Sequence, residues 1–88
     1  MSTLEQRKLA AWRKARVAVG HNPAHARQDE FGWWIVWSEY GNRNSAWGWE
    51  IDHGVPTVLG GTDSLANLRA LHWRNNASLG GLLGAALR

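Results

Sequence analysis

The combination of seven tryptophans with no cysteine is the feature that most limits how this chain of 88 residues can fold. A chain this short buries only about 60–65% of the surface that it exposes when unfolded, so its core is thin. Domains of this size often rely on disulfides or a structural metal for stability. The missing cysteines exclude a disulfide framework, a thiolate zinc site and a cysteine nucleophile. Each aromatic side chain buries roughly 150–250 Å², so we predict a core built on tryptophan.

We expect a soluble, intracellular protein, because the sequence shows no signal for secretion or membrane insertion. The first residues, MSTLEQRKLAAW, carry charges where a signal peptide needs an apolar run. The longest apolar stretch, residues 79–87, is far shorter than the roughly 20 residues that span a bilayer.

The first third of the chain has the pattern of an amphipathic helix followed by a loop. Ser2-Thr3-Leu4-Glu5 fits a capping box, good helix formers follow, and a glycine stands where the helix would stop. We predict a helix over residues 3–19 with a basic outer face, docked on the rest of the protein by Trp12. Residues 20–28 are predicted to form a loop, because Asn22-Pro23 is a turn signal.

Two strands are predicted in the middle of the chain. Phe31–Ser38 is rich in aromatic and β-branched residues, which favour strands. Trp47–His53 alternates with a period of two, which places Trp47, Trp49 and Ile51 together on one face. Such alternation is typical of a half-buried strand.

The last third of the chain is predicted to form a loop, a short turn and a helix. Residues 55–63 contain a proline and two adjacent glycines, which favour a loop. Residues 65–68 can form a short turn that Asp63 or Ser64 caps. A second helix can begin at Trp73, although three glycines weaken it.

Charge is unevenly distributed along the chain, although the net charge is only +3. Residues 1–27 carry six basic residues and one acid, whereas residues 28–52 carry five acids and one arginine. This division suits a protein that holds a polyanion with one part and a cation with another. The alternative interpretation is a solvated helix with ordinary surface charge, because the overall balance is not extreme.

The stretch WEIDHGVPTVLGGTDSLANLRALHWRNNASLGG, from Trp49 to Gly81, holds polar residues of catalytic type in a particular order. Asp52-His53 ends the predicted strand, and Asn67 and Asn76 follow. The loop residues that complete the pattern are Pro56, Gly60, Gly61, Asp63 and Leu68. This order resembles the HNH endonuclease family, in the cysteine-free form seen in phage proteins.

The resemblance implies an α+β protein with a ββα-metal core, also called a His-Me finger, and an N-terminal amphipathic helix. We predict a single domain over residues 1–88. Its basic helix and loop would occupy residues 1–28, the ββα-metal core residues 31–81 and an apolar tail residues 82–88. The implied activity is metal-dependent hydrolysis of DNA phosphodiester bonds. Little sequence specificity is expected, because no dedicated base-reading module fits in a chain this short.

The resemblance also assigns roles to the polar residues of the motif. His53 would be the general base, and Asn67 would hold the loop and orient that base through hydrogen bonds. Asp52 and Asn76 would bind one divalent ion, Mg²⁺ or Mn²⁺. In an ideal strand Asp52 and His53 point to opposite faces, so both can approach one phosphate only if the strand bends or ends there.

These residue types suit phosphodiester hydrolysis for physical reasons. Water is a poor nucleophile, and a histidine with an unperturbed pKa of roughly 6.5 can accept its proton near neutral pH. Carboxylate and amide oxygens are hard ligands of the kind that Mg²⁺ and Mn²⁺ prefer. A divalent ion can stabilise the charge that develops at the reacting phosphate.

The chain departs from the family pattern in two places. Many members carry two Cys-x-x-Cys pairs that bind zinc, and here His72 and Asn75 occupy the positions of the second pair. We expect His72 to be packed or hydrogen-bonded in the core, and we keep Asn75 as the alternative to Asn76 as ligand. The family often has a lysine near the position of Leu79, and its loss can reduce affinity or rate.

The resemblance makes DNA, in double-stranded form, the expected partner, with five candidate phosphate contacts. These are Arg69, Arg74, Arg43, Arg13 and Lys14. Five tryptophans around the predicted strands either replace the missing zinc as packing or stack in part on unpaired bases. They are Trp33, Trp34, Trp37, Trp47 and Trp49.

Phage relatives act beside packaging machinery, so a terminase or portal protein in the cytoplasm of a bacterial host is a further possible partner. Two alternatives remain. One is a catalytically weakened module that keeps the HNH fold and binds DNA or serves phage packaging. The other is an assembly protein whose apolar tail makes an oligomer contact.

Overall fold

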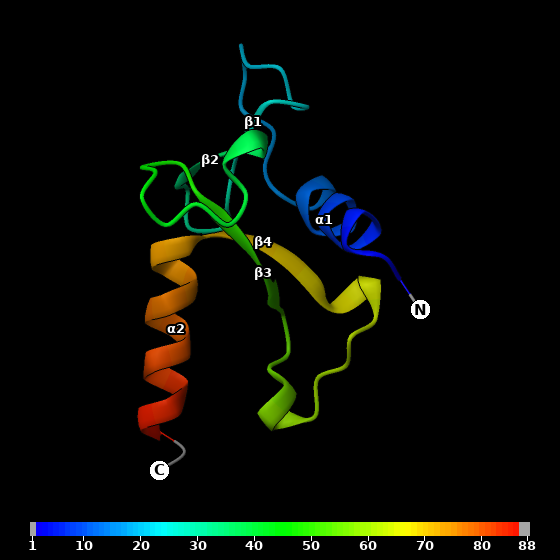
Figure 1. Ribbon diagram of the computed structural model, residues 1–88, viewed down its shortest axis with the longest axis vertical. Coiled ribbons are helices and arrows are strands. Elements are labelled where there is room, and N and C mark those ends of the chain that lie inside the picture. The colour runs from blue at the N-terminus through cyan, green and yellow to red at the C-terminus, as the bar shows by residue number, and fades with distance from the viewer. Residues whose placement is uncertain (1, 87–88) are drawn as a thin grey trace.

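The computed structural model describes the backbone of residues 2–86 and the side chains of residues 2–80. Within these limits the chain is a small α+β structure with two helices and two antiparallel sheets of two strands each (Figure 1). The elements in chain order are α1 (Leu4–Arg13), β1 (Ala26–Gln28), β2 (Trp34–Val36), β3 (Trp49–His53), β4 (Leu68–His72) and α2 (Trp73–Ala86). Short 3₁₀ turns lie at Trp37–Glu39, Thr57–Leu59 and Leu65–Asn67.

Helix α1 begins at a capping box one residue later than the sequence predicts. The Thr3 hydroxyl accepts a hydrogen bond from the Gln6 backbone N–H, and the Gln6 side chain accepts one from the Thr3 backbone N–H. The predicted extension to residue 19 is wrong, because the helix ends at Arg13. Soon after this point the backbone of Arg16 exchanges two hydrogen bonds with Gln28, which draws the chain into an extended conformation.

The first sheet is smaller than predicted and contains an unexpected strand. β1 lies inside the predicted loop over residues 20–28, and β2 covers only the centre of the predicted strand Phe31–Ser38. Asp29 explains the late start of β2, because its carboxylate accepts hydrogen bonds from the backbone of Phe31 and Trp33 and holds a turn there.

Strands β3 and β4 form the central hairpin, with Trp49 opposite His72 and His53 opposite Leu68. The sequence did not predict β4. The predicted strand Trp47–His53 is confirmed from Trp49 onward, but Trp47 does not share the buried face: it is 53% exposed, whereas Trp49 is fully buried. The backbone approaches closely before the strand, since a Cβ on Gly48 would lie 2.0 Å from the carbonyl oxygen of Asn42.

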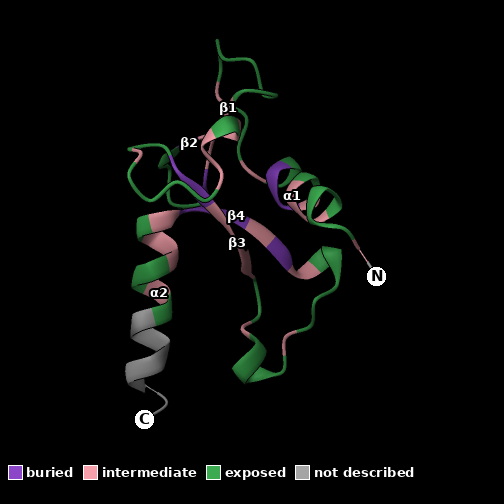
Figure 2. Cartoon of the chain, in the orientation of Figure 1, coloured by how far each residue is buried: buried purple, intermediate pink, exposed green. Residues whose placement is uncertain are grey.

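Aromatic rings form the core between α1 and the hairpin, in the region coloured as buried in Figure 2. The Trp49 ring centroid lies 5.1 Å from that of Trp12, 5.5 Å from that of Trp37 and 4.9 Å from that of Tyr40. The indole N–H groups of Trp12 and Trp49 donate to backbone carbonyls, so burial leaves neither unpaired. Trp12 therefore docks the first helix as predicted, and Trp37 and Trp49 provide the expected packing, whereas Trp33, Trp34 and Trp47 stay largely exposed.

Helix α2 follows β4 without a loop, which confirms the helix predicted from Trp73. It runs down beside the lower half of the hairpin, opposite the long β3–β4 connection (Figure 1). The side chains of the predicted apolar tail, residues 82–88, lie outside the described part of the chain. No helix within the described residues is long and apolar enough to cross a membrane.

Candidate functional site

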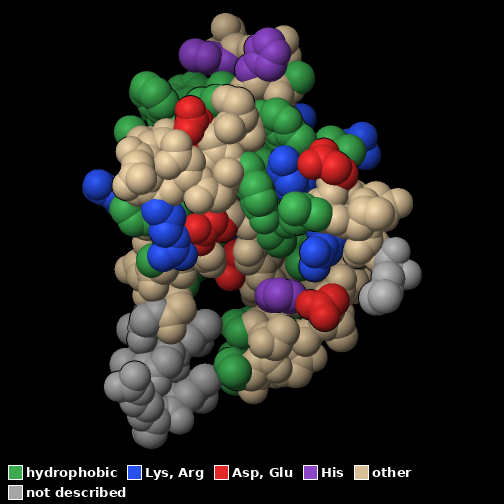
Figure 3. Space-filling model, viewed as in Figure 1, with side chains coloured by type: hydrophobic (Ala, Val, Ile, Leu, Met, Phe, Trp, Pro, Cys, Tyr) green, Lys and Arg blue, Asp and Glu red, His purple; other side chains and the backbone are tan. Residues whose placement is uncertain are grey.

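A cavity of about 400 Å³ lies where the β3–β4 hairpin, its connecting loop and α2 meet. Figure 3 shows the surface hollowed between α2 and the loop. Asp52 and His53 both line the cavity. Adjacent residues of a strand normally point to opposite faces, but His53 is the last residue of β3. The full lining consists of Asp52, His53, Pro56, Thr57, Leu59, Arg69, Leu79 and Gly80.

Asp52 is paired across the hairpin with Arg69, which stands opposite it in the strand register. The guanidinium Nε of Arg69 donates to a carboxylate oxygen of Asp52 at 2.7 Å, and its Nη1 contacts the carboxylate of Glu30. A cation thus already occupies one oxygen of the predicted metal ligand. The predicted phosphate contact Arg69 lies at the site, held between two carboxylates.

His53 is oriented by Asp63, a residue of the sequence motif for which we predicted no catalytic role. The imidazole Nε2 lies 2.8 Å from a carboxylate oxygen of Asp63. An ionised carboxylate only accepts hydrogen bonds, so this contact assigns the proton of a neutral imidazole to Nε2. The other ring nitrogen, Nδ1, then carries the lone pair that can accept a proton. The His53 side chain is 32% exposed and accessible to water.

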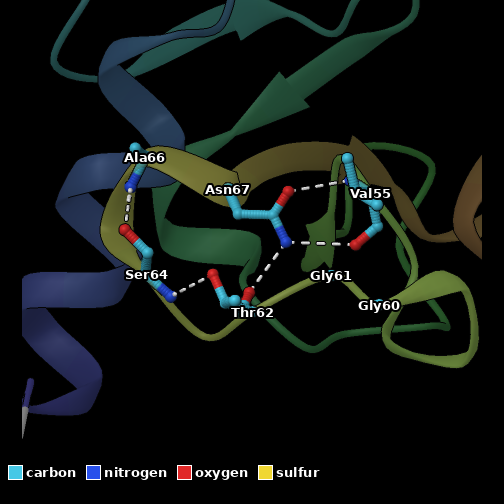
Figure 4. A pocket seen from close by; sticks show the side chains of 7 residues that line it. All are labelled: Val55, Gly60, Gly61, Thr62, Ser64, Ala66 and Asn67. Carbon is cyan, nitrogen blue, oxygen red and sulfur yellow. Dashed lines mark hydrogen bonds between the residues drawn. The ribbon is translucent and has the colours of Figure 1, made fainter.

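Asn67 closes the β3–β4 connection with its side-chain amide, as Figure 4 shows. Its oxygen accepts from the Val55 backbone N–H at 2.8 Å, and its nitrogen donates to the carbonyls of Val55 at 3.0 Å and Thr62 at 2.7 Å. A glycine is required next to these hydrogen bonds, because a Cβ on Gly61 would lie 1.7 Å from the Val55 carbonyl oxygen. All three of these hydrogen bonds go to backbone groups, so the Asn67 amide holds the loop that carries Asp63.

Asn76 on α2 contacts Glu50, which precedes Asp52 by two residues and so shares its face of β3. The Asn76 Nδ2 donates to a Glu50 oxygen at 2.9 Å, which leaves the Asn76 amide oxygen as the group able to bind a cation. Leu79, one helical turn further along α2, lines the cavity with Asp52. Glu50 was missed as a site residue, although strand alternation alone places it beside Asp52.

Arg43 fixes Glu50 in turn through two hydrogen bonds, at 2.6 and 2.8 Å. These bonds are the main reason why the pKa of Glu50 lies below its ordinary value; partial burial opposes the shift and the Asn76 bond adds to it. The same pairing raises the pKa of Arg43. An ionised glutamate is therefore the acceptor that orients Asn76.

His72 and Asn75 do not line this cavity and have their own partners. His72 is 2% exposed; its Nε2 donates to the Ala46 carbonyl at 2.8 Å and its Nδ1 accepts from the Arg74 backbone N–H. The expectation of a hydrogen-bonded core histidine is confirmed. Asn75 donates to buried Asp29 at 2.8 Å, whereas Asn76 faces Glu50.

The remaining candidate phosphate contacts differ in whether their charged groups already have partners within the protein. Arg43 is paired with Glu50, and Lys14 donates to the backbone carbonyls of Leu65 and Leu68, the latter at 2.7 Å. Arg74 lies over the Trp73 ring at 5.0 Å. Within the part of the chain that the structure describes, Arg13 and Arg74 have no carboxylate partner.

Asp52 lines the cavity and Asn76 does not, although both carry oxygen donors of the type that a hard divalent cation prefers. Asp52 offers a carboxylate and Asn76 an amide oxygen, which are ligands of the type that Mg²⁺ takes together with water and phosphate oxygens. Among the described residues, no three histidine or acidic side chains gather in a group that could hold a metal by themselves. An ion at this site would therefore depend on water or substrate for its remaining ligands.

Comparison of the chain with protein-family models, curated proteins and solved structures finds no match. The resemblance to the HNH family therefore depends on the sequence motif alone.

Proposed function

We propose that this chain is a metal-dependent endonuclease of the HNH type that hydrolyses phosphodiester bonds in DNA. One observation carries the proposal: Asp52 and His53, adjacent in sequence, line the same open cavity together with Arg69. A ligand for a cation, a general base and a cation for phosphate are thus available to one substrate group. In this proposal β3, β4 and α2 form a ββα-metal core, and α1 packs on it.

His53 acts as the general base of the proposed reaction. Its Nε2 points to Asp63, so Nδ1 accepts the proton of the attacking water, and Asp63 stabilises the imidazolium that forms. Asn67 keeps the loop closed so that Asp63 stays within reach of the ring. Arg69 contacts a phosphate oxygen once its bond to Asp52 is released.

Asp52 and Asn76 would hold the divalent ion, Mg²⁺ or Mn²⁺, with Glu50 orienting the Asn76 amide through the hydrogen bond to its nitrogen. When bound, the ion would supply positive charge for the transition state and the leaving oxygen. The partner is double-stranded DNA in the cytoplasm of a bacterial host, with a phage terminase or portal protein as a second possible partner.

A catalytically weakened binding module is the second candidate, and two observations favour it. Arg69 neutralises Asp52, and apolar Leu79 lines the cavity near the position where the family often has a lysine. Such a module would keep DNA binding but not turnover.

The test is a nicking assay on supercoiled plasmid in Mg²⁺ or Mn²⁺. Replacing the base, His53→Ala, should lower the rate by roughly 10²–10⁴-fold and leave DNA affinity unchanged, because the base acts only in the chemical step. His25→Ala, in an exposed loop distant in sequence from the motif, is the matched control and should nick at the parent rate.

Equal nicking by His53→Ala and the parent would show that His53 is not the base. A parent that binds DNA but never nicks it would favour the binding module.

A further inference from the structure

The turn between β1 and β2 presents two aromatic side chains to solvent. Phe31 is 53% exposed and Trp33 is 43% exposed, on either side of Gly32. Large apolar side chains of a small chain are normally needed in the core. Two of them on one short turn therefore form a candidate contact surface.

A fully buried carboxylate holds this turn in place. One oxygen of Asp29 accepts from the backbone N–H groups of Phe31 at 3.0 Å and Trp33 at 2.9 Å. The other accepts from the His72 backbone at 3.0 Å and the Asn75 side chain at 2.8 Å, at the start of α2. Because the turn is fixed to the helix before any ligand arrives, little ordering cost remains for binding.

A cation without a carboxylate partner among the described residues lines the same hollow as Trp33. Trp33, Ala46, His72 and Arg74 line a hollow of about 100 Å³. The Trp33 ring meets the His72 ring edge-on at a centroid distance of 4.9 Å, and Trp33 remains 43% exposed. Arg74 is an exposed residue whose guanidinium lies over the Trp73 ring at 5.0 Å and, among the described residues, has no carboxylate partner.

This surface is continuous with the candidate catalytic cavity. Phe31 lines a second hollow, of about 160 Å³, with Asn75, Ser78 and Leu79 of α2. Leu79 also lines the cavity that contains Asp52 and His53. A strand that lies along the first turns of α2 can thus reach Trp33 and the cavity together.

We propose that Phe31, Trp33 and Arg74 bind unpaired nucleotides next to the cleaved phosphate, so that the substrate class is duplex DNA that contains a single-stranded segment. This inference rests on the proposed nuclease function, and it names the substrate of the same site. An aromatic face stacks on a base, and an unpaired cation contacts the phosphate that follows. Bases stacked inside an intact duplex do not offer their faces to Trp33, so the surface selects unpaired ones.

The experiment measures binding of a fluorescently labelled oligothymidylate and of a duplex of the same length, by anisotropy with EDTA present. Trp33→Leu and Phe31→Leu should each weaken single-strand binding at least about fivefold, from the loss of one stacked base, and leave duplex binding unchanged. Trp34→Leu is the matched control. Trp34 is 37% exposed on the neighbouring β2 but packs against His21 with tilted rings whose centroids are 4.6 Å apart, so the variant should bind as the parent does. Thermal melting verifies that each variant is folded.

Equal single-strand affinity for folded Trp33→Leu and the parent would overturn this inference, as would equal losses in Trp33→Leu and Trp34→Leu. If the Trp33-dependent binding is found but the parent never cleaves, the nuclease proposal fails while the surface stands. If the parent nicks plasmid but Trp33 is irrelevant to single-strand binding, only this inference fails. A parent that binds neither nucleic acid contradicts both and leaves a protein partner as the occupant of the surface.

Discussion

The two faces of strand β3 carry different kinds of side chain. Trp49 and Ile51, with Ala70 of β4, share the face that packs with Trp12 of α1. Glu50 and Asp52 point the other way, where their partners are Asn76 of α2, Arg43 and Arg69. One strand thus alternates between residues that form the core and residues that form the candidate site.

The difference shows how a short chain with a small core can separate the residues that stabilise the fold from those that could carry out chemistry. Removing apolar surface from water contributes about 25 cal/mol per Å², and aromatic side chains have the largest area. Partly exposed ion pairs contribute only about 0–1 kcal/mol each. The apolar face therefore carries most of the free energy of folding, which leaves the polar face able to exchange partners.

The largest effect is expected on the apolar face. Trp49→Ala should lower the free energy of unfolding by about 3–5 kcal/mol, because it removes a fully buried indole from the centre of the aromatic cluster. Denaturant titration followed by circular dichroism measures the loss. Trp47→Ala is the matched control, since its side chain is 53% exposed two residues earlier. Similar losses in the two variants would contradict the assignment of stability to this face.

The second prediction separates binding from stability on the polar face. Asp52→Asn should weaken Mn²⁺ binding at least about tenfold, by analogy with the loss of residues that support metal ligands, and change the unfolding free energy by less than about 1 kcal/mol. The asparagine oxygen can still accept from Arg69, so the hairpin remains joined. Calorimetric titration with Mn²⁺ alone measures the affinity. Asp63→Asn, whose side chain is 85% exposed, should bind Mn²⁺ as the parent does.

An unchanged Mn²⁺ affinity in Asp52→Asn would remove Asp52 from the ligand set. A large loss of stability would show instead that the Asp52–Arg69 pair supports the fold.

The same division explains which parts of the molecule the sequence predicted. The period of two in Trp49–His53 and the capping residues near Thr3 are local signals, so the strand forms and the first helix begins close to where they are expected. β4 has the sequence LRALH, whose leucine, alanine and arginine favour helix, and it becomes a strand because it pairs with β3. Its existence depends on a partner that no local pattern identifies.

The site residues that local patterns mark were predicted, whereas their partners from distant segments were not. The motif marked Asp52, His53, Asn67 and Asn76, and strand alternation could have added Glu50. Arg69 pairs with both Asp52 and Glu30, and these ion pairs join segments far apart in the sequence. Charge counts show that the middle of the chain is acidic but not which arginine neutralises which acid.

The smallest predicted effect concerns the ion pair that orients Asn76. The pKa of Glu50 is lower in the folded chain than its ordinary value of 4.5. Such a carboxylate stabilises the fold at pH values above the unfolded pKa, and this contribution is lost as the pH falls through the folded pKa. Glu50→Gln should therefore lower the unfolding free energy by about 1 kcal/mol or less near neutral pH, with a difference from the parent that closes in acid. Arg43→Ala removes the main cause of the shift and should show the same pH dependence. Denaturant titrations over a pH series, at low and high salt, measure both differences. Because the Arg43–Glu50 pair is partly exposed to solvent, salt should reduce the difference in unfolding free energy between variant and parent at neutral pH. A difference that persists in acid would mean that Glu50 acts through packing and not through its charge.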